Sequence, residues 1–90
     1  MREIHLDGKK MNTAENTHLY LRVKLDLPYY YGDNLDALWD CLSEISDISL
    51  ITLENSTVLK KQLGNYADSL IRIFEDYKQE NPDFNFEILS

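Results

Sequence analysis

The sequence is poor in several residue types, and each shortage excludes a class of protein. A single cysteine, Cys41, excludes an internal disulfide framework, and with only two histidines in the chain it also disfavours a zinc site. No apolar run approaches the roughly 20 residues that span a bilayer, and the opening residues, MREIHLDGKK, lack the apolar stretch of a secretion signal. We therefore expect one small domain over residues 1–90, located in the cytoplasm, with no metal and no cofactor.

Basic residues are absent from the middle of the chain. No lysine or arginine occurs between Leu25 and Leu59, and this segment holds seven acids: Asp26, Asp33, Asp36, Asp40, Glu44, Asp47 and Glu54. Outside the segment nine acids balance nine bases, so the segment carries the whole net charge of −7. Direct binding to nucleic acid or to an anionic membrane is disfavoured, because both require a basic patch. A basic protein partner is favoured instead, since a surface of one sign attracts its opposite.

Hydrophobic periodicity predicts alternating strands and helices. Alternation and β-branched apolar runs indicate strands at residues 3–7, 48–54 and 84–89. Helical spacing indicates helices at residues 34–45 and 66–80, with a short helix between them that Asn55-Ser56-Thr57 caps and that ends at Gly64. Strands separated by helical segments pair in parallel through crossovers, so the expected fold class is α/β with a three-stranded parallel sheet.

Residues 14–25 carry two conflicting patterns. The run LYLRVKLDL, residues 19–27, alternates apolar and polar positions as a strand does. A helical stripe competes with this alternation, formed by Ala14, His18, Leu21 and Leu25. The cap-like Asn12-Thr13 near the start and the stop at Pro28 favour a helix over residues 14–25.

The predicted helix at residues 34–45 gathers negative charge on one face. Its apolar positions recur at helical spacing: Leu35, Leu38, Leu42 and Ile45. At about 100° per residue, Asp36, Asp40 and Glu44 fall within about 80° of one another, and no basic side chain relieves their repulsion. Trp39, the only tryptophan, lies on the seam between the two faces. Taken separately, the charges fit a solvated acidic face and Trp39 fits a half-buried core residue. Taken together with Tyr30, the charges and Trp39 are typical of an interface hot spot.

The segment PYYYGDNLDALWDCLSE, residues 28–44, resembles the signature of the barstar family. Its most specific parts are Tyr30-Tyr31-Gly32 and the run from Asn34 to Leu42, and weaker matches continue at Gly8, His18, Lys61-Gln62-Leu63, Phe74, Lys78 and Leu89-Ser90. Members of this family are small intracellular inhibitors of secreted bacterial ribonucleases such as barnase. The resemblance implies a three-stranded parallel sheet packed with about four helices. It also implies a 1:1 complex with a basic, barnase-like ribonuclease, whose active site the second helix and its preceding loop would occlude.

The resemblance also assigns roles to individual residues by their positions. Asp40 would take the place of the scissile phosphate and bond to the catalytic arginine and histidine groups of the enzyme. Asp36 would pair with a second cationic group, and Tyr30 would lie against the catalytic histidine. The remaining contacts would come from Asn34, Leu35, Trp39 and Ser43, with Asp76 as an outlying charge partner.

Several positions differ from a well-studied member of the family, and three of them bear on the contact. Glu44 stands in place of a glycine, Ile45 in place of a tryptophan and Asp76 in place of a glutamate. Glu44 adds bulk and charge, Ile45 removes an aromatic ring, and Asp76 is shorter by one methylene group. We include these residues in the expected partner-binding surface, where the differences favour a different cognate ribonuclease.

Other functions are compatible with the residues alone. Asp33, Asp36 and Asp40 offer the carboxylate oxygens that Mg²⁺ takes in an enzyme, although their spacing lacks the glycine and terminal glutamate of a calcium loop. A generic acidic adaptor for some other basic protein also fits the composition. A nucleophilic Cys/His site is disfavoured, because Cys41 and His18 both fall where the helices turn inward. We therefore expect an inhibitor and not an enzyme.

Overall fold

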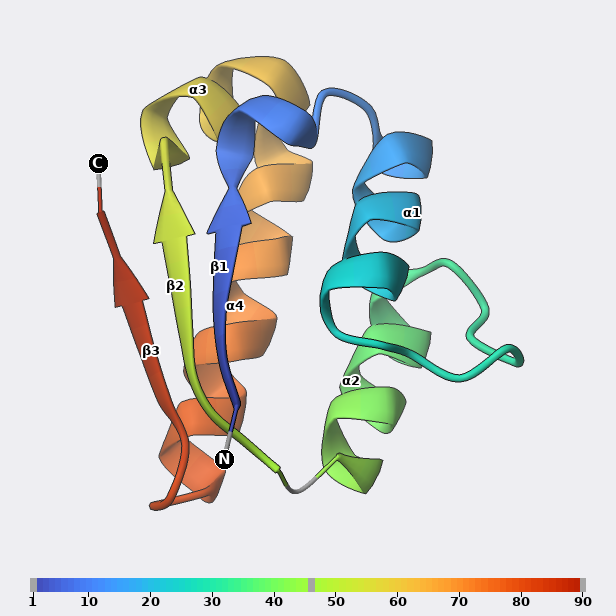
Figure 1. Cartoon of the computed structure of the whole chain (residues 1–90). Helices are drawn as coiled ribbons and strands as arrows, with labels where there is room; N and C mark the ends of the chain where they lie inside the picture. The colour runs from blue at the N-terminus through green and yellow to red at the C-terminus, as the bar shows by residue number, and fades with distance from the viewer. Residues whose placement is uncertain (1, 46, 90) are drawn as a thin grey trace.

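Three strands form one parallel sheet in the computed structural model of the protein, which describes residues 2–45 and 47–89 (Figure 1). The strands are β1 (Arg2–Asp7), β2 (Ile48–Glu54) and β3 (Asn85–Ile88), and β2 lies between the other two. At the centre of the sheet Ile51 pairs with Ile4 of β1 and with Phe86 of β3. The α/β class, the predicted strands and their parallel pairing are confirmed.

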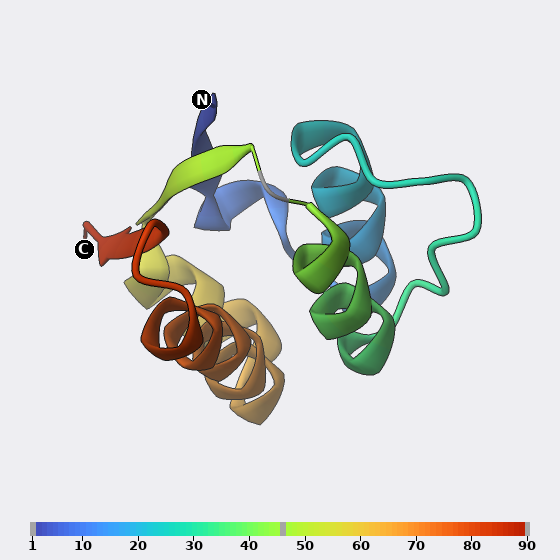
Figure 2. The same cartoon turned by 90° about the horizontal axis from the view of Figure 1, so that it is seen from below.

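Within the described residues, four helices and a short 3₁₀ turn make the two crossovers. The first runs through η1 (Gly8–Lys10), α1 (Ala14–Lys24) and α2 (Leu35–Glu44), and the second through α3 (Ser56–Leu63) and α4 (Asn65–Glu80). Because strands are added in one direction across the sheet, crossovers of the same hand place all the helices on one side. Figure 2 shows α3 and α4 beneath the sheet, with α1 and α2 beyond β1. None of the described helices combines the length and the apolar character needed to cross a bilayer.

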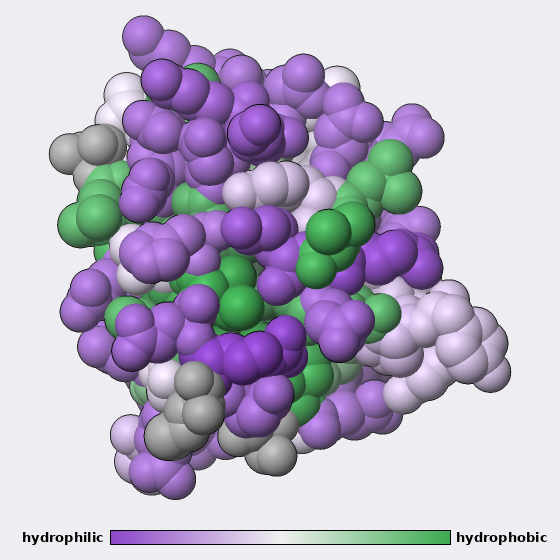
Figure 3. Space-filling model, viewed as in Figure 1, coloured by the Kyte–Doolittle hydropathy of each residue, from purple (hydrophilic) through white to green (hydrophobic). Residues whose placement is uncertain are grey.

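The two faces of the sheet differ in polarity, as this arrangement requires. Toward the helices, Leu6, Ile51 and Phe86 are buried and share one core with Phe74 of α4. The rings of Phe74 and Phe86 stack with their centroids 5.2 Å apart. No helix of the described residues covers the opposite face, and the exposed His5 of β1 lies there beside Glu54. Figure 3, which views this face, shows a largely hydrophilic surface with apolar areas near its centre and toward its left and right edges.

The conflict over residues 14–25 is resolved in favour of the helix. The side chain of Thr13 caps α1 by accepting from the backbone N–H of Asn16 at 3.0 Å. The helical stripe is buried at His18 and Leu21, whereas Val23 of the alternating run is 77% exposed. The prediction of a helix is therefore confirmed, because packing on one side selects the 3.6-residue period over the two-residue period.

The predicted cap at the start of α3 is wrong in its chemistry. Asn55 stands at the N-cap position in the left-handed conformation, with φ of 57°, and makes no capping hydrogen bond. Its side chain instead donates to Oδ1 of Asp7 at 2.8 Å, and this bond is the main cause that lowers the pKa of Asp7. Beside this contact, Gly8 lies so close to Asn55 that a Cβ atom on Gly8 would be 2.4 Å from the carbonyl oxygen of Asn55. A glycine is therefore required at this point.

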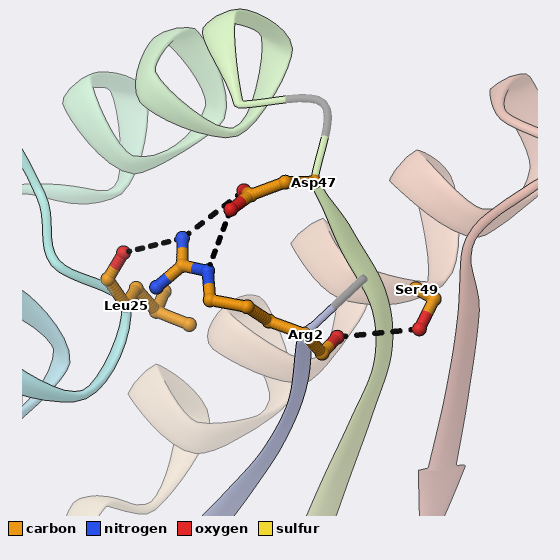
Figure 4. A network of polar contacts seen from close by, with 4 residues as sticks. All are labelled: Arg2, Leu25, Asp47 and Ser49. Carbon is orange, nitrogen blue, oxygen red and sulfur yellow. Dashed lines mark hydrogen bonds and ion pairs between the residues drawn. The ribbon is translucent and has the colours of Figure 1, made fainter.

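Arg2 joins three segments at the amino-terminal end of the sheet (Figure 4). Its guanidinium bonds Asp47 in a bidentate manner, at 2.9 Å through Nε and 3.2 Å through Nη2, and Nη2 also reaches the carbonyl oxygen of Leu25 at 3.4 Å. The backbone oxygen of Arg2 accepts from the hydroxyl of Ser49 at 3.3 Å. The end of α1, the start of β2 and β1 are thereby tied together, and the Arg2 bond holds the pKa of Asp47 below its ordinary value.

We predict that Asp47→Asn lowers the free energy of unfolding at neutral pH by removing the charged partner of Arg2. Because the folded-state pKa of Asp47 is lowered from 3.8, its contribution is present above that value and is lost as the pH falls through the folded pKa. Urea denaturation of wild type and variant over a pH series should therefore show a difference that shrinks in acid. Asp83→Asn, which removes an exposed acid outside any ion pair of the described residues, is the control. A difference that persists below the folded pKa would contradict the assignment.

Candidate partner-binding site

The helix α2 separates its buried and charged side chains onto two faces. Asn34 caps it, because its Oδ1 accepts from the N–H of Ala37 at 2.8 Å. Inside, Leu38 and Leu42 are almost completely buried. Outside, the acidic face consists of exposed carboxylates one turn apart: Asp36, Asp40 and Glu44. No basic residue lies in the last turn, and among the described residues none of these acids has an ion pair. The predicted concentration of negative charge on one helix face is thus present in the structure.

A groove between α2 and α4 adjoins the acidic face. It has a volume of about 360 Å³ and is lined by Leu35, Asp36, Trp39, Ile73, Asp76, Gln79 and Glu80. Trp39 is half-buried, and its ring meets that of Tyr77 edge-on at 6.0 Å. The fold therefore brings Asp76 of α4 to the same groove as Asp36 and Trp39, although they are far apart in the chain. The walls combine apolar surface with carboxylates, which suits a lysine or arginine side chain because its stem is apolar and its end is charged.

The tyrosine loop (residues 28–33) projects beside the acidic face. Figure 1 shows it extending away from the helices, and in Figure 3 it forms a pale lobe beyond the rest of the surface. Tyr29 is 92% exposed and Tyr30 60%, and their rings meet edge-on at 5.6 Å. The hydroxyl of Tyr30 donates to Oε2 of Glu44 at 2.8 Å, and this bond is the main cause that raises the pKa of Tyr30. Glu44 thus holds Tyr30 against the end of α2.

Beneath the loop, Tyr31 is buried and bonded to His18. The hydroxyl of Tyr31 meets Nδ1 of His18, and the hydroxyl of Tyr66 on α4 meets Nε2. One hydroxyl donates and the other accepts if the imidazole is neutral, so both ring nitrogens are satisfied. Burial favours that neutral form and lowers the pKa of His18, with the charge of Asp33 acting in the opposite direction. The expectation that His18 faces inward is confirmed, and its ring is a core histidine with both nitrogens bonded.

Three of the expected site residues have polar groups already engaged within the protein. The side chain of Asn34 donates to Gly32 O at 3.1 Å in addition to its cap bond. The hydroxyl of Ser43 donates to the carbonyl oxygen of Trp39 at 3.0 Å. The carbonyl oxygen of Ile45 accepts from the hydroxyl of Tyr77 at 3.2 Å. Ser43 and Ile45 line a separate hollow of about 240 Å³, so the structure does not place them in the groove that holds Asp76.

The structure gives no support to the catalytic alternatives. Asp33 is paired with Arg22 at 2.7 Å, and no three His, Cys, Asp or Glu side chains of the described residues gather as metal ligands. Cys41 is buried, and burial raises the pKa of its thiol, so it remains an un-ionised core residue at neutral pH. His18 is occupied by its two tyrosine partners. None of these groups is arranged to act on a substrate.

Sequence reasoning missed several residues around the site. Tyr29 is the most exposed aromatic of the loop, and the run of three tyrosines after Pro28 was a signal that could have included it. Glu80 lines the groove only because α4 lies beside α2. Arg22 contacts the loop from α1, and no spacing pattern relates it to Asp33. Glu80 and Arg22 reach the site through tertiary packing.

An exposed acidic helix, a projecting aromatic loop and an apolar groove with charged walls together define a protein-binding module. Comparison with known proteins identifies the module further. The chain matches the family model described as "Barstar (barnase inhibitor)" over residues 1–89. It is 41% identical over 90 residues to "Putative ribonuclease inhibitor YrdF" of Bacillus subtilis (strain 168), covering 99% of this chain and 98% of that protein. The chain therefore belongs to the barstar family, whose members are inhibitors and not enzymes.

We predict that His18→Leu destabilises the protein by about 2–3 kcal/mol, because both tyrosine hydroxyls lose their partner and that of Tyr31 stays buried. Urea denaturation followed by Trp39 fluorescence measures the loss. Leu19→Ala, a change at a 51% exposed position of the same helix, should alter stability by no more than about 0.5 kcal/mol.

A comparison of wild type with the His18→Leu variant also tests the protonation state of His18. Because burial lowers the pKa of His18 from 6.5, the unfolded chain binds the proton first, and wild type should lose stability as the pH falls below that value. The His18→Leu variant should lack this part of the acid dependence. An unchanged dependence in the variant would show that His18 is not the group responsible.

Proposed function

We propose that this protein inhibits a secreted, basic, barnase-like ribonuclease by occluding its active site in a 1:1 complex. Membership of the barstar family supports the inhibitor class, and the exposed carboxylates of α2 beside the tyrosine loop carry the proposal for the mechanism. A ribonuclease active site is cationic, because it must bind a phosphodiester. A helix that presents carboxylates without neutralising cations is complementary to such a site.

Asp40 is the centre of the proposed contact. It lies on the acidic face with Asp36 one turn before it and Glu44 one turn after it. A carboxylate shares with phosphate its negative charge and its paired oxygen acceptors, and an arginine fork binds both in a bidentate manner. We assign Asp40 to the catalytic arginine and histidine groups of the enzyme, in place of the substrate phosphate.

The groove and the loop extend the contact on either side of Asp40. Asp36 and Asp76 line the groove with Trp39, so a second cationic side chain of the enzyme finds two carboxylates and an aromatic surface there. Tyr30 projects from the opposite side, where it is suited to lie against the catalytic histidine. Leu35 and the peripheral polar residues Asn34 and Ser43 complete the surface.

Glu44 and Ile45 stand where a well-studied member of the family has glycine and tryptophan. Glu44 has its carboxylate bonded to Tyr30, so the two side chains present one unit to the partner. Ile45 is half-buried against the core and offers a small apolar contact at the end of α2. We propose that this edge selects the cognate ribonuclease, because its side chains lie at the rim of the proposed contact and differ from those of that member.

The long-range field favours rapid binding. The net charge is −7 and arises from the segment that contains the site. A one-sign surface steers a partner of opposite charge, and the effect weakens as added salt screens it. A cytoplasmic location is part of the proposal, since the free thiol of Cys41 suits a reducing compartment.

Titration against a panel of barnase-like ribonucleases, with RNA cleavage as the readout, tests the function. We expect stoichiometric inhibition of at least one enzyme and an association rate that falls with ionic strength. Barnase-unrelated basic proteins added as competitors should not restore cleavage. If every ribonuclease of the panel stays active at equimolar protein and low salt, the acidic adaptor becomes the better reading.

We predict that Asp40→Ala weakens inhibition by roughly a hundredfold or more, the range of a central hot-spot residue. Glu44→Ala should cost roughly tenfold or less, although it also releases Tyr30, because a charge at the rim stays partly solvated. Glu15→Ala, which removes one acid from the far end of α1, controls for net charge and should leave inhibition nearly unchanged. Inhibition constants from cleavage assays give all three values, and equal losses for Asp40→Ala and Glu44→Ala would reject the central role of Asp40.

A further inference from the structure

The contacts beneath the tyrosine loop point to a residue of α1 that acts on binding from a distance. We propose that Arg22 is a positioning residue: it fixes the tyrosine loop in the conformation that presents Tyr30, without itself touching the partner. The binding part of this inference rests on the proposed function. The ordering of the loop is a property of the free protein.

A single nitrogen of Arg22 joins two points of the loop. Its Nη2 donates to the backbone oxygen of Tyr31 at 3.2 Å and to Oδ1 of Asp33 at 2.7 Å. The guanidinium carbon also lies 5.6 Å from the centre of the Tyr31 ring, within the range of a cation–π contact. These contacts restrain the residues that directly follow Tyr30, from a rigid helix 11 residues earlier.

The backbone of the loop adopts a conformation that needs a restraint. Asp33 has φ of 55°, in the left-handed region that residues other than glycine occupy at a cost. The preceding turn is closed by a bond from the N–H of Tyr31 to the carbonyl oxygen of Pro28 at 3.0 Å, which does not include Asp33. The second half of the loop is held by the ion pair of Asp33 with Arg22 and by the bond from the side chain of Asn34 to the backbone oxygen of Gly32. Of these two bonds, only the ion pair ties the loop to α1.

The position of Arg22 carries a cost of its own. Its Nε is buried and has no hydrogen-bond partner among the described residues. A buried donor without a partner lowers the stability of the folded protein. Arg22 bears this cost in the conformation that places its guanidinium against the loop. Local costs of this kind are typical of functional positions, which supports a role for Arg22 beyond stability.

Charge and positioning predict effects of opposite sign for a substitution at Arg22. Arg22→Met makes the protein more negative, which by long-range attraction alone strengthens association with a basic ribonuclease. Loss of positioning weakens binding instead, because an unrestrained loop must be ordered when the complex forms. Lys24→Met provides the matched control, since it removes the same charge from an exposed residue two positions along α1 with no side-chain bond among the described residues.

The experiment measures inhibition constants for six proteins: wild type, Arg22→Met, Arg22→Lys, Lys24→Met, Tyr30→Ala and the double variant Tyr30→Ala/Arg22→Met. Urea denaturation confirms that each is folded. We expect Arg22→Met to weaken inhibition by roughly tenfold and Arg22→Lys, which keeps the charge but lacks the planar guanidinium over the Tyr31 ring, to weaken it less. Lys24→Met should leave inhibition unchanged or slightly stronger. In a Tyr30→Ala background the effect of Arg22→Met should largely disappear, because the residue being positioned is gone.

Backbone ¹⁵N relaxation of the free proteins reads the loop directly. Residues 30–33 should become more mobile in Arg22→Met and stay ordered in Lys24→Met. Unchanged loop order in Arg22→Met would overturn the inference whether or not a ribonuclease is inhibited. The inference would also be overturned if Arg22→Met weakened inhibition by the same factor in the Tyr30→Ala background as in wild type. Altered loop order in a protein that inhibits no ribonuclease would instead uphold Arg22 as the residue that orders the loop and reject the proposed function.

Discussion

The acidic surface of this protein depends on what the opposite side of α2 buries. Leu38 and Leu42 are at most 1% exposed, and burial of each such side chain contributes about 1.5–3 kcal/mol. Repulsion between like charges one turn apart costs only a few tenths of a kcal/mol per pair. Packing therefore outweighs repulsion, and the core holds Asp36 and Asp40 toward solvent without an ion pair among the described residues. A partner that supplies the missing cations gains the attraction that the protein leaves unused.

Rigidity is the second property that the structure gives to this surface. The tyrosine loop is bonded from above by Glu44, through Tyr30, and from below by His18 and Arg22. A loop held in this way has lost much of its conformational freedom before a partner arrives, so less free energy is spent on ordering it in a complex. The imidazole of His18 therefore belongs to the core and, through its bond to Tyr31, also fixes the segment that carries the exposed Tyr29 and Tyr30.

Most of the fold was predictable because its elements have strong local signals. The β-branched apolar run of β2 indicates a buried strand, and the stripe on α4 matches the helical period, and the structure confirms both elements. Residues 14–25 match two periods, and only burial of His18 and Leu21 selects the helix. Asn55 was misjudged for a related reason: a bond to Asp7, 48 residues away, outcompetes the local cap.

For the site, the amino-acid sequence by itself determined the charge, the acidic helix face and the tyrosine-rich segment before it, since these depend on residue order over one or two turns. Tertiary structure alone decided that Asp76 faces the same groove as Asp36, that Tyr30 reaches Glu44, and that Arg22 supports the loop. Each of these contacts joins elements whose separation in the chain carries no periodic signal. Their geometry follows from how the helices pack on one side of the sheet, and that packing is set by the whole core at once.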